Sequence, residues 1–492
     1  MRFQRASNGD IVTLAENHRL GAGGEARIYA VPGEPRLVAK IWHKPTPERS
    51  RKLRVMLANP PMDPMAAHHH ASIAWPIDVL SAPGRPQALA GFIMPRVENM
   101  RPVGEFSNPK VRRTRCPLFN YAYLYRTARN LATAVRALHE RGYVIGDLNE
   151  SNVLVAETAL VTIVDTDSFQ VWDAEAGVMY RCRVGKPEYT PPELQGKSFA
   201  QVDREAAHDR FGLGVLIFQL LMEGTHPFAG VYRGRGEPPL LEQRIAASHF
   251  PYAREAHLFY APKPTAPPFD TLAPGLRDLC LRCFQDGHFR PSLRPEPQSW
   301  QYVIEEAESH LVTCQWNSQH VFGDHLEQCP WCERAEQLAG RDPFPSIEGV
   351  KRGEHRAPPP WARERGGARS GQRRSPFWPT GMPNIPKPPP IPPSAPRART
   401  SRRRRPRPLL GDWNDWAWVA LASSGLAAGA AASFQWQANP LTFLCGIFAL
   451  LTGILGEAKA RSPELDGRGK WIARTGLALG TGALVWCLTA TV

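Results

Sequence analysis

The sequence YVIGDLNESNVL, residues 143–154, says more about this protein than any other part of the chain. Asp147 and Asn152 stand five residues apart in it, and the short apolar run that follows leads to Asp165. We expect these three groups at strand ends, close together in the fold. Phosphoryl transfer from a nucleotide uses such a set: a carboxylate that takes a hydroxyl proton, and an amide and a second carboxylate that hold Mg²⁺. The stretch therefore predicts a phosphoryl-transfer site.

Length and charge limit the remaining choices. A chain of 492 residues predicts more than one domain. Much of the net charge of +14 lies in residues 351–408, so a basic linker carries the excess rather than a basic folded surface. A basic segment beside a membrane explains this at least as well as a nucleic-acid partner, and no specific nucleic acid is expected. The spacing of the nine cysteines is not that of a disulfide scaffold, which favours a reducing cytosol.

A glycine cluster and a lysine precede this stretch. Gly21 and Gly23 follow a short β-like run, and glycines let backbone N–H groups approach phosphate oxygens closely. Lys40 then lies in the apolar run Val-Ala-Lys-Ile, where a buried lysine needs an anionic partner. A glycine loop followed by a strand and Val-Ala-Lys is a much stronger pattern than either part alone.

In this order, the motifs resemble those of protein kinases of the compact bacterial serine/threonine type, over about residues 14–308. The resemblance implies an α+β, two-lobed kinase-like fold for residues 1–310, with ATP and Mg²⁺ (or Mn²⁺) as cofactors and a protein substrate. It also implies roles for individual residues. Gly21 and Gly23 would cover the phosphates, Lys40 contact the α- and β-phosphates, Pro95 and Val97 read adenine, Asp147 act as the catalytic base, and Asn152 and Asp165 hold the metal.

Three of the chain's departures from the family pattern lie at or beside the catalytic residues. Ile145-Gly146 replaces His-Arg before the catalytic base, which argues against activation by loop phosphorylation through that arginine. Thr166-Asp167 replaces Phe-Gly after the metal-binding aspartate. Asn149 stands where the family has a lysine, and we hypothesise that Lys186 supplies the catalytic positive charge at the γ-phosphate that Asn149 cannot. A solvated loop lysine is the alternative.

The resemblance also implies specific ionic contacts. Glu48 is the only acidic residue in the segment after the Lys40 strand and is the expected partner of Lys40 in the nucleotide site. A first-turn carboxylate favoured by a helix dipole is the alternative. Arg290 is the expected partner of Glu193, and Asp209 is expected to bind backbone N–H groups of the catalytic loop.

Residues 121–141 are predicted to form an amphipathic helix that leads into the catalytic loop. Its apolar face would consist of Leu124, Ala128, Leu131, Val135 and Leu138.

Residues 311–335 predict a small zinc-binding segment. Cys329 and Cys332 form a Cys-x2-Cys knuckle, and Cys314 and His320 can complete four zinc ligands, with His325 as the alternative to His320. Unmetallated surface cysteines are the competing interpretation. Because so short a segment has little core of its own, metal would be its main stabiliser.

The remainder predicts a linker and a membrane region. Residues 336–410 are rich in Pro and Arg and are predicted to form a disordered linker. Residues 411–492 contain three apolar segments, predicted as transmembrane helices at 416–434, 441–456 and 471–492. The positive-charge distribution then predicts a multi-pass protein of the cell inner (cytoplasmic) membrane with a cytosolic kinase domain. Small residues in the helices would allow a homo-oligomer, and a soluble helical domain is the alternative.

Together these features predict a membrane-tethered, ATP-dependent serine/threonine kinase of a signalling pathway. The alternative is a nucleotide-binding pseudokinase that acts as a scaffold or sensor. The missing His-Arg, Asn149 and Thr166-Asp167 keep this alternative open.

Overall fold

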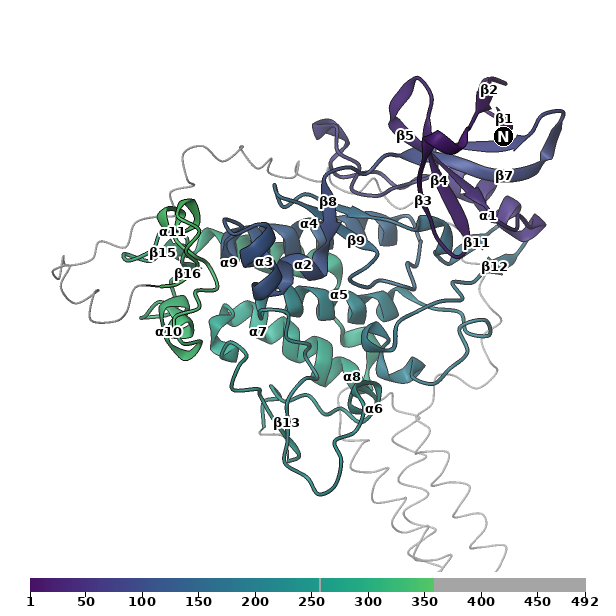
Figure 1. The fold of residues 1–492 in the computed structure, drawn as a ribbon. Coiled ribbons are helices and arrows are strands. Elements are labelled where there is room, and N and C mark those ends of the chain that lie inside the picture. Colours follow the sequence, from purple (N-terminus) through teal and green to yellow (C-terminus); the bar gives the residue numbers. More distant parts are fainter. Residues whose placement is uncertain (256–257, 358–492) are drawn as a thin grey trace, which may run out of the picture. The chain divides into compact units, whose positions relative to one another are not determined.

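The computed structural model describes residues 1–255 and 258–357, and all of them lie within one compact unit, Met1–Ile391 (Figure 1). An N-terminal lobe is built on a β-sheet, and a C-terminal lobe consists mainly of helices. The predicted mixed α+β, two-lobed architecture is therefore confirmed.

The sheet of the N-terminal lobe has seven antiparallel strands in the order β2-β1-β6-β7-β5-β4-β3. Side chains alternate between its faces, so that Ala39 of β5 joins one apolar cluster while Trp42 joins the other. Lys40 follows the parity of Trp42, on the face where Leu53 of helix α1 (Pro47–Ala58) packs. The strands are β1 (Arg2–Arg5), β2 (Ile11–Thr13), β3 (Arg19–Ala22), β4 (Ala26–Val31), β5 (Glu34–Trp42), β6 (Asp78–Ala82) and β7 (Arg85–Pro95).

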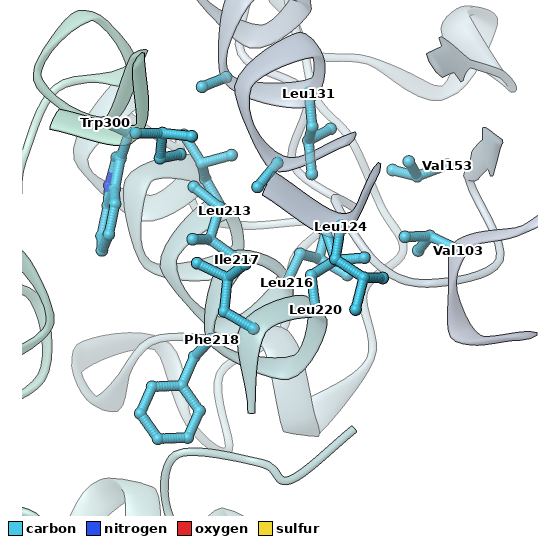
Figure 2. Packing of buried hydrophobic residues seen from close by; sticks show 14 of the residues in the cluster. Val103, Leu124, Leu131, Val153, Leu213, Leu216, Ile217, Phe218, Leu220 and Trp300 are labelled. Carbon is cyan, nitrogen blue, oxygen red and sulfur yellow. The ribbon is translucent and has the colours of Figure 1, made fainter. Parts of the chain in front are cut away.

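Two long helices, α4 (Tyr121–Glu140) and α5 (Ala206–Leu221), form the centre of the C-terminal lobe. The Asn120 side chain caps α4 by accepting a hydrogen bond from the Ala122 N–H at 3.1 Å. Figure 2 shows Leu124 of α4 next to Leu216 and Leu220 of α5. All five apolar positions predicted for this helix are buried, so its predicted core face is confirmed.

Short elements surround these helices. A three-stranded sheet in the order β10-β9-β8 carries the residues that follow the catalytic loop. Its strands are β8 (Met100–Pro102), β9 (Val153–Ala156) and β10 (Val161–Ile163), and two hairpins pair β11 (Val171–Asp173) with β12 (Val178–Tyr180) and β13 (Val231–Tyr232) with β14 (Tyr260–Ala261). The other helices are α2 (Val103–Ser107), α3 (Pro109–Arg115), α6 (Leu241–Ala246), α7 (Pro274–Leu281), α8 (Gly287–Phe289) and α9 (Pro297–Ser309).

The cysteine-containing segment continues the C-terminal lobe rather than standing apart from it. It consists of β15 (Leu311–Thr313), β16 (Val321–Gly323), α10 (Pro330–Gln337) and α11 (Ile347–Lys351). Trp331 of α10 is fully buried, with its ring centroid 4.6 Å from that of Tyr121 and 4.8 Å from that of Phe344. Arg334 and Glu223 form a buried ion pair at 2.6 Å. The segment therefore shares the core of the lobe.

The predicted start of the linker at residue 336 is wrong, because α11 follows it and Phe344 is 1% exposed in the core. The rest of the predicted linker, residues 358–410, lies outside the described residues, as do the three predicted transmembrane segments within 411–492. In the part of the chain that the structure describes, no helix is both long and apolar enough to cross a bilayer.

Candidate active site

Asp209, near the start of α5, binds the main chain of the catalytic loop, which lies within residues 143–154. Its carboxylate accepts hydrogen bonds from the N–H of Ile145 at 2.7 Å and of Gly146 at 2.8 Å. His139 lies 3.0 Å from the same carboxylate. Because both donors are main-chain groups, this contact fixes the backbone just before Asp147. The expected role of Asp209 is confirmed.

Two asparagines orient Asp147. The side-chain amide of Asn149 donates to Asp147 Oδ1 at 2.7 Å, and that of Asn152 donates to Asp147 Oδ2 at 3.2 Å and to its carbonyl oxygen at 2.9 Å. Asn149 is 1% exposed. The amide that replaces the family's lysine therefore acts within the loop as a support for the carboxylate.

Asp165 lies beside Asn152 because the N–H of Val164 donates to the carbonyl oxygen of Asn152 at 3.0 Å. The backbone of Asp165 is left-handed, with φ of 59°, a conformation that aspartate adopts more readily than most residues. Ser168 donates to the Asp165 carbonyl from both its N–H and its hydroxyl. The Asp165 side chain is 41% exposed. The structure thus brings the two predicted Mg²⁺ ligands to one place.

Lys40 is held by two carboxylates from the other lobe. Its Nζ lies 2.7 Å from Asp165 Oδ1 and 2.5 Å from Asp167 Oδ1. Burial disfavours the charged lysine, but Asp167 and Asp165 more than offset this and raise the pKa of Lys40 above its ordinary value. On the neighbouring strand, Gly91 is a necessary glycine, since a Cβ there would stand 2.0 Å from the Lys40 carbonyl oxygen.

The predicted pair between Lys40 and Glu48 is wrong. Glu48 lies in the first turn of α1, and its carboxylate accepts from Arg183 at 2.9 and 3.1 Å instead. One turn later, α1 turns Lys52 toward the site, where its Nζ donates to the Asp167 carbonyl oxygen at 2.6 Å. Burial lowers the pKa of Lys52 to about 8. The helix therefore offers the site a cation and no carboxylate.

The residues expected to cover the phosphates are Gly21 and Gly23, and those expected to form the adenine-reading hinge are Pro95 and Val97. The space around Gly21 is open, with no atom within 4 Å of the position a Cβ would take. At Gly23 only the Ala26 carbonyl oxygen comes that close, at 3.9 Å. Pro95 ends β7 and pairs in register with Leu37 of β5. Among the described residues, no protein acceptor takes the N–H of Val97. This is the donor that the hinge would offer to adenine.

Arg204 fills the space beside the catalytic loop that Gly146 leaves. Gly146 has a φ of 78°, and a Cβ there would stand 2.7 Å from both Arg204 Nη1 and Cys182 Cβ. Arg204 is 4% exposed, and its guanidinium lies 3.9 Å from the ring centroid of Phe199. Its Nη2 donates to the carbonyl oxygen of Val184, in the activation segment, residues 165–193, at 2.6 Å. Sequence reasoning missed this arginine, since no motif marks it.

Lys186 contacts the loop but not Asp147. Its Nζ lies 2.7 Å from Glu150 Oε1 and 2.6 Å from Ser151 Oγ. Lys186 is therefore neither a free surface lysine nor a direct partner of the catalytic aspartate in this state. Its role at the γ-phosphate stays a prediction.

The ion pair that closes the activation segment uses a different arginine from the one predicted. Arg294 donates to both oxygens of Glu193, at 2.6 and 2.7 Å, and its side chain is fully buried. The predicted partner, Arg290, is exposed. Arg290 and Arg294 each directly precede a proline, Pro291 and Pro295, so the motif alone did not separate them.

The four predicted zinc ligands form one cluster. The ligand atoms of Cys314, His320, Cys329 and Cys332 all lie within 4.8 Å of one another. His320 turns Nδ1 toward Cys332 Sγ, at 3.5 Å, and Nε2 toward Asp342 Oδ1, at 2.8 Å. The alternative ligand, His325, points away and contacts the Asp270 carbonyl oxygen. Sequence reasoning missed Asp342 because it lay in the supposed linker.

The arrangement suits a nucleotide with a divalent cation. Lys40 is buried beside two carboxylates, the space around Gly21 is open, and the Val97 N–H has no protein acceptor among the described residues. Carboxylate and amide oxygens are the ligands that Mg²⁺ accepts beside phosphates. The groups present therefore fit ATP with Mg²⁺, with Asn152 and Asp165 as the protein ligands.

Residues 102–299 match the family model described as the protein kinase domain, in keeping with the two-lobed fold and the residues of this site. Over 329 residues, 66% of the chain, the sequence is 33% identical to "Protein kinase YegI" of Escherichia coli O157:H7 and 32% identical to its counterpart in strain K12. A "Probable cAMP-dependent protein kinase catalytic subunit" of Encephalitozoon cuniculi (strain GB-M1) is 31% identical over 129 residues, 26% of this chain and 37% of that protein. The chain spans about half the length, 49%, of the E. coli relatives. It is thus similar to bacterial protein kinases.

Proposed function

We propose that this protein transfers the γ-phosphate of ATP to serine or threonine hydroxyls of protein substrates. The observation that carries the proposal is that hydrogen bonds connect Asp147 to Asn152 and Lys40 to Asp165, while the Val164 N–H, next to Asp165, donates to the Asn152 carbonyl oxygen. Asp147 would accept the proton of the attacking hydroxyl, with Asn149 and Asn152 holding its carboxylate in place. Lys40 would hold the α- and β-phosphates.

Asn152 and Asp165 would hold Mg²⁺, which supplies neutralisation of the phosphate charge when it is bound. Lys186 is proposed to add positive charge near the acceptor, after exchanging its contact with Glu150 for one with the γ-phosphate. A comparison of Lys186→Ala with Asn149→Ala tests that role, and an unchanged kcat in Lys186→Ala would exclude it.

The full-length protein, incubated with Mg²⁺, γ-labelled ATP and a general phosphate acceptor such as casein, tests the kinase activity. We expect label on serine and threonine after acid hydrolysis and none with Asp147→Asn, which keeps the shape of the side chain. Nucleotide binding without transfer to itself or to any acceptor would favour the pseudokinase alternative. Label on tyrosine alone would contradict the serine/threonine specificity.

We also propose that Cys314, His320, Cys329 and Cys332 bind a structural Zn²⁺. Their donor set of three thiols and one imidazole and the Asp342 carboxylate behind His320 support this assignment, since zinc-bound histidines usually donate their other N–H to such a group. Elemental analysis of the full-length protein should find one zinc per chain, retained in Cys116→Ala and lost in Cys329→Ser. Equal zinc in both variants would contradict the site.

Membrane attachment is a proposal from the amino-acid sequence of residues 411–492. The three apolar segments and the basic residues before them favour a multi-pass protein of the inner membrane, with the kinase domain in the cytosol and contacts between copies through the helices. Fractionation of the full-length protein should leave it in the carbonate-washed membrane pellet. Recovery in the soluble fraction would contradict the proposal.

A further inference from the structure

Lys40 has two carboxylate partners, and one of them would bind Mg²⁺ when the nucleotide and the metal are present. Asp165 lies 2.7 Å from Lys40, but it is also the residue that would hold Mg²⁺. A lysine that must stay aimed at phosphates needs a partner that remains when the metal arrives. Asp167, at 2.5 Å, is the other carboxylate on the lysine.

Helix α1 does not provide that partner. Glu48 is its one acidic residue, half-exposed and paired with the half-exposed Arg183. The side chain that α1 turns inward is Lys52, which donates to the Asp167 carbonyl oxygen at 2.6 Å. The carboxylate partner of Lys40 that is free of the proposed metal site therefore comes from the activation segment, at the position where the kinase pattern has a glycine.

Asp167 is also held independently of Lys40. Its Oδ2 accepts a hydrogen bond from the indole N–H of Trp42 at 3.2 Å, and its side chain is 12% exposed. Trp42 and Lys40 project from the same face of β5, two residues apart. Lys40 and Trp42 of β5 thus bind one oxygen each of the Asp167 carboxylate, which fixes the orientation of the lysine side chain.

From this geometry, and resting on the proposed use of ATP, we propose that Asp167 is the positioning residue of Lys40 and replaces a helix carboxylate in that role. The lysine is then aligned by the segment that also bears the metal ligand, so the movement of α1 alone does not break the ion pair. Asp167 acts through Lys40 and need not touch the nucleotide.

Calorimetric binding of adenylyl-imidodiphosphate with Mg²⁺ to the full-length protein tests this without requiring phosphate transfer. We expect Asp167→Asn to weaken binding by about tenfold, the effect of losing one charge-assisted contact. Lys40→Met should weaken binding similarly, and the double variant should bind no more weakly than Lys40→Met, because the second change acts through the first. A purely structural role of Asp167 would give additive losses.

Glu48→Gln is the matched comparison, since it removes the carboxylate that the kinase pattern would assign. Its binding should stay within about twofold of the original. Trp42→Phe keeps every charge and serves if Asp167→Asn does not fold; it should weaken binding by about threefold. A loss in Glu48→Gln equal to that in Asp167→Asn, additive losses in the cycle, or unchanged binding in Asp167→Asn or Trp42→Phe would each overturn the inference.

The outcomes also separate this inference from the proposed function. Binding of the nucleotide without phosphate transfer would contradict the proposed kinase activity, and the same variants would still decide whether Asp167 positions Lys40. No binding of the nucleotide to the unaltered protein would overturn both.

Discussion

Arg204 ties the activation segment to the catalytic loop, because its Nη2 donates to the carbonyl oxygen of Val184 at 2.6 Å while its Nη1 lies against Gly146. In the kinase pattern, an arginine next to the catalytic aspartate meets a phosphorylated side chain. Here the arginine comes from a later part of the chain and meets a main-chain oxygen, which is present whether or not the segment is phosphorylated.

Replacing Arg204 should therefore lower the rate of transfer without removing nucleotide binding. We expect Arg204→Met to reduce kcat by roughly tenfold or more, since the loop that carries Asp147 loses its neighbour. Binding of an ATP analogue should change less than twofold. Arg181, a partly exposed arginine of the same segment that pairs with Asp203, provides the control, and Arg181→Met should keep its rate. Phosphatase treatment of the original protein should leave the rate unchanged, and a large fall would contradict this account.

The ion pair between Arg294 and Glu193 should be among the most costly to break. The Arg294 side chain is fully buried, so Arg294→Met removes both short hydrogen bonds to Glu193 and leaves it only His208, 3.5 Å away. We expect a loss of about 3–5 kcal/mol in the free energy of unfolding. Arg290→Met, four residues earlier and exposed, should change it by about 0.5 kcal/mol or less. Urea denaturation of both variants measures the two losses. Equal losses of unfolding free energy would mean that Arg290, the arginine suggested by the motif, matters as much as Arg294.

His226 should make the protein less stable in mild acid. Its Nε2 lies 2.9 Å from the Glu188 carbonyl oxygen, and Nδ1 accepts from the Phe228 N–H, so the ring is neutral. Burial lowers the pKa of His226 from 6.5 to about 4. The unfolded chain therefore binds a proton at a higher pH than the folded protein does. The contribution of neutral His226 to the free energy of unfolding is fully present above about pH 6.5. It falls by about 1.4 kcal/mol per pH unit as the pH drops toward 4.

His226→Gln should flatten this part of the pH profile of the unfolding free energy. His310→Gln, at an exposed position, should leave the slope as it is. An unchanged slope in the His226 variant would mean that other groups cause the acid sensitivity.

Asp342 should strengthen zinc binding without touching the metal. It accepts from His320 Nε2 at 2.8 Å and is 2% exposed. We expect Asp342→Asn to lower zinc affinity by about 10- to 100-fold, because the imidazole loses the group that orients it. Competition with a chromophoric chelator measures this. Asp324→Asn, an exposed aspartate of the same segment, is the control; equal losses in the two variants would contradict the role of Asp342.

Much of the fold and site could be predicted because the deciding residues are close in sequence. The spacing of Asp147, Asn152 and Asp165, and the helical period of Leu124 to Leu138, are local patterns, and the structure places these groups as expected. The cluster of Cys314, His320, Cys329 and Cys332 was predicted for the same reason. Their donor types and short separations leave few other arrangements.

The errors concern pairs that only the tertiary structure brings together. Glu48 was the one acidic residue of its segment, yet it lies a turn too early on α1 to face the sheet. Asp167, 127 residues from Lys40, had no pattern that assigned it to the lysine. Residues 336–357 looked like the start of a Pro-rich linker, because the burial of Phe344 depends on Tyr121 and Trp331 on distant elements.

The position of Trp331 between Tyr121 and Phe344 also bears on how such a chain can be altered in evolution. The first turn of α4 is completed by rings that the chain adds some two hundred residues later. The cysteine-containing segment therefore cannot be exchanged as a separate cassette, or removed by ending the chain at residue 310, without exposing an apolar surface of the C-terminal lobe. Any lineage that loses these residues must repack the start of α4 at the same time.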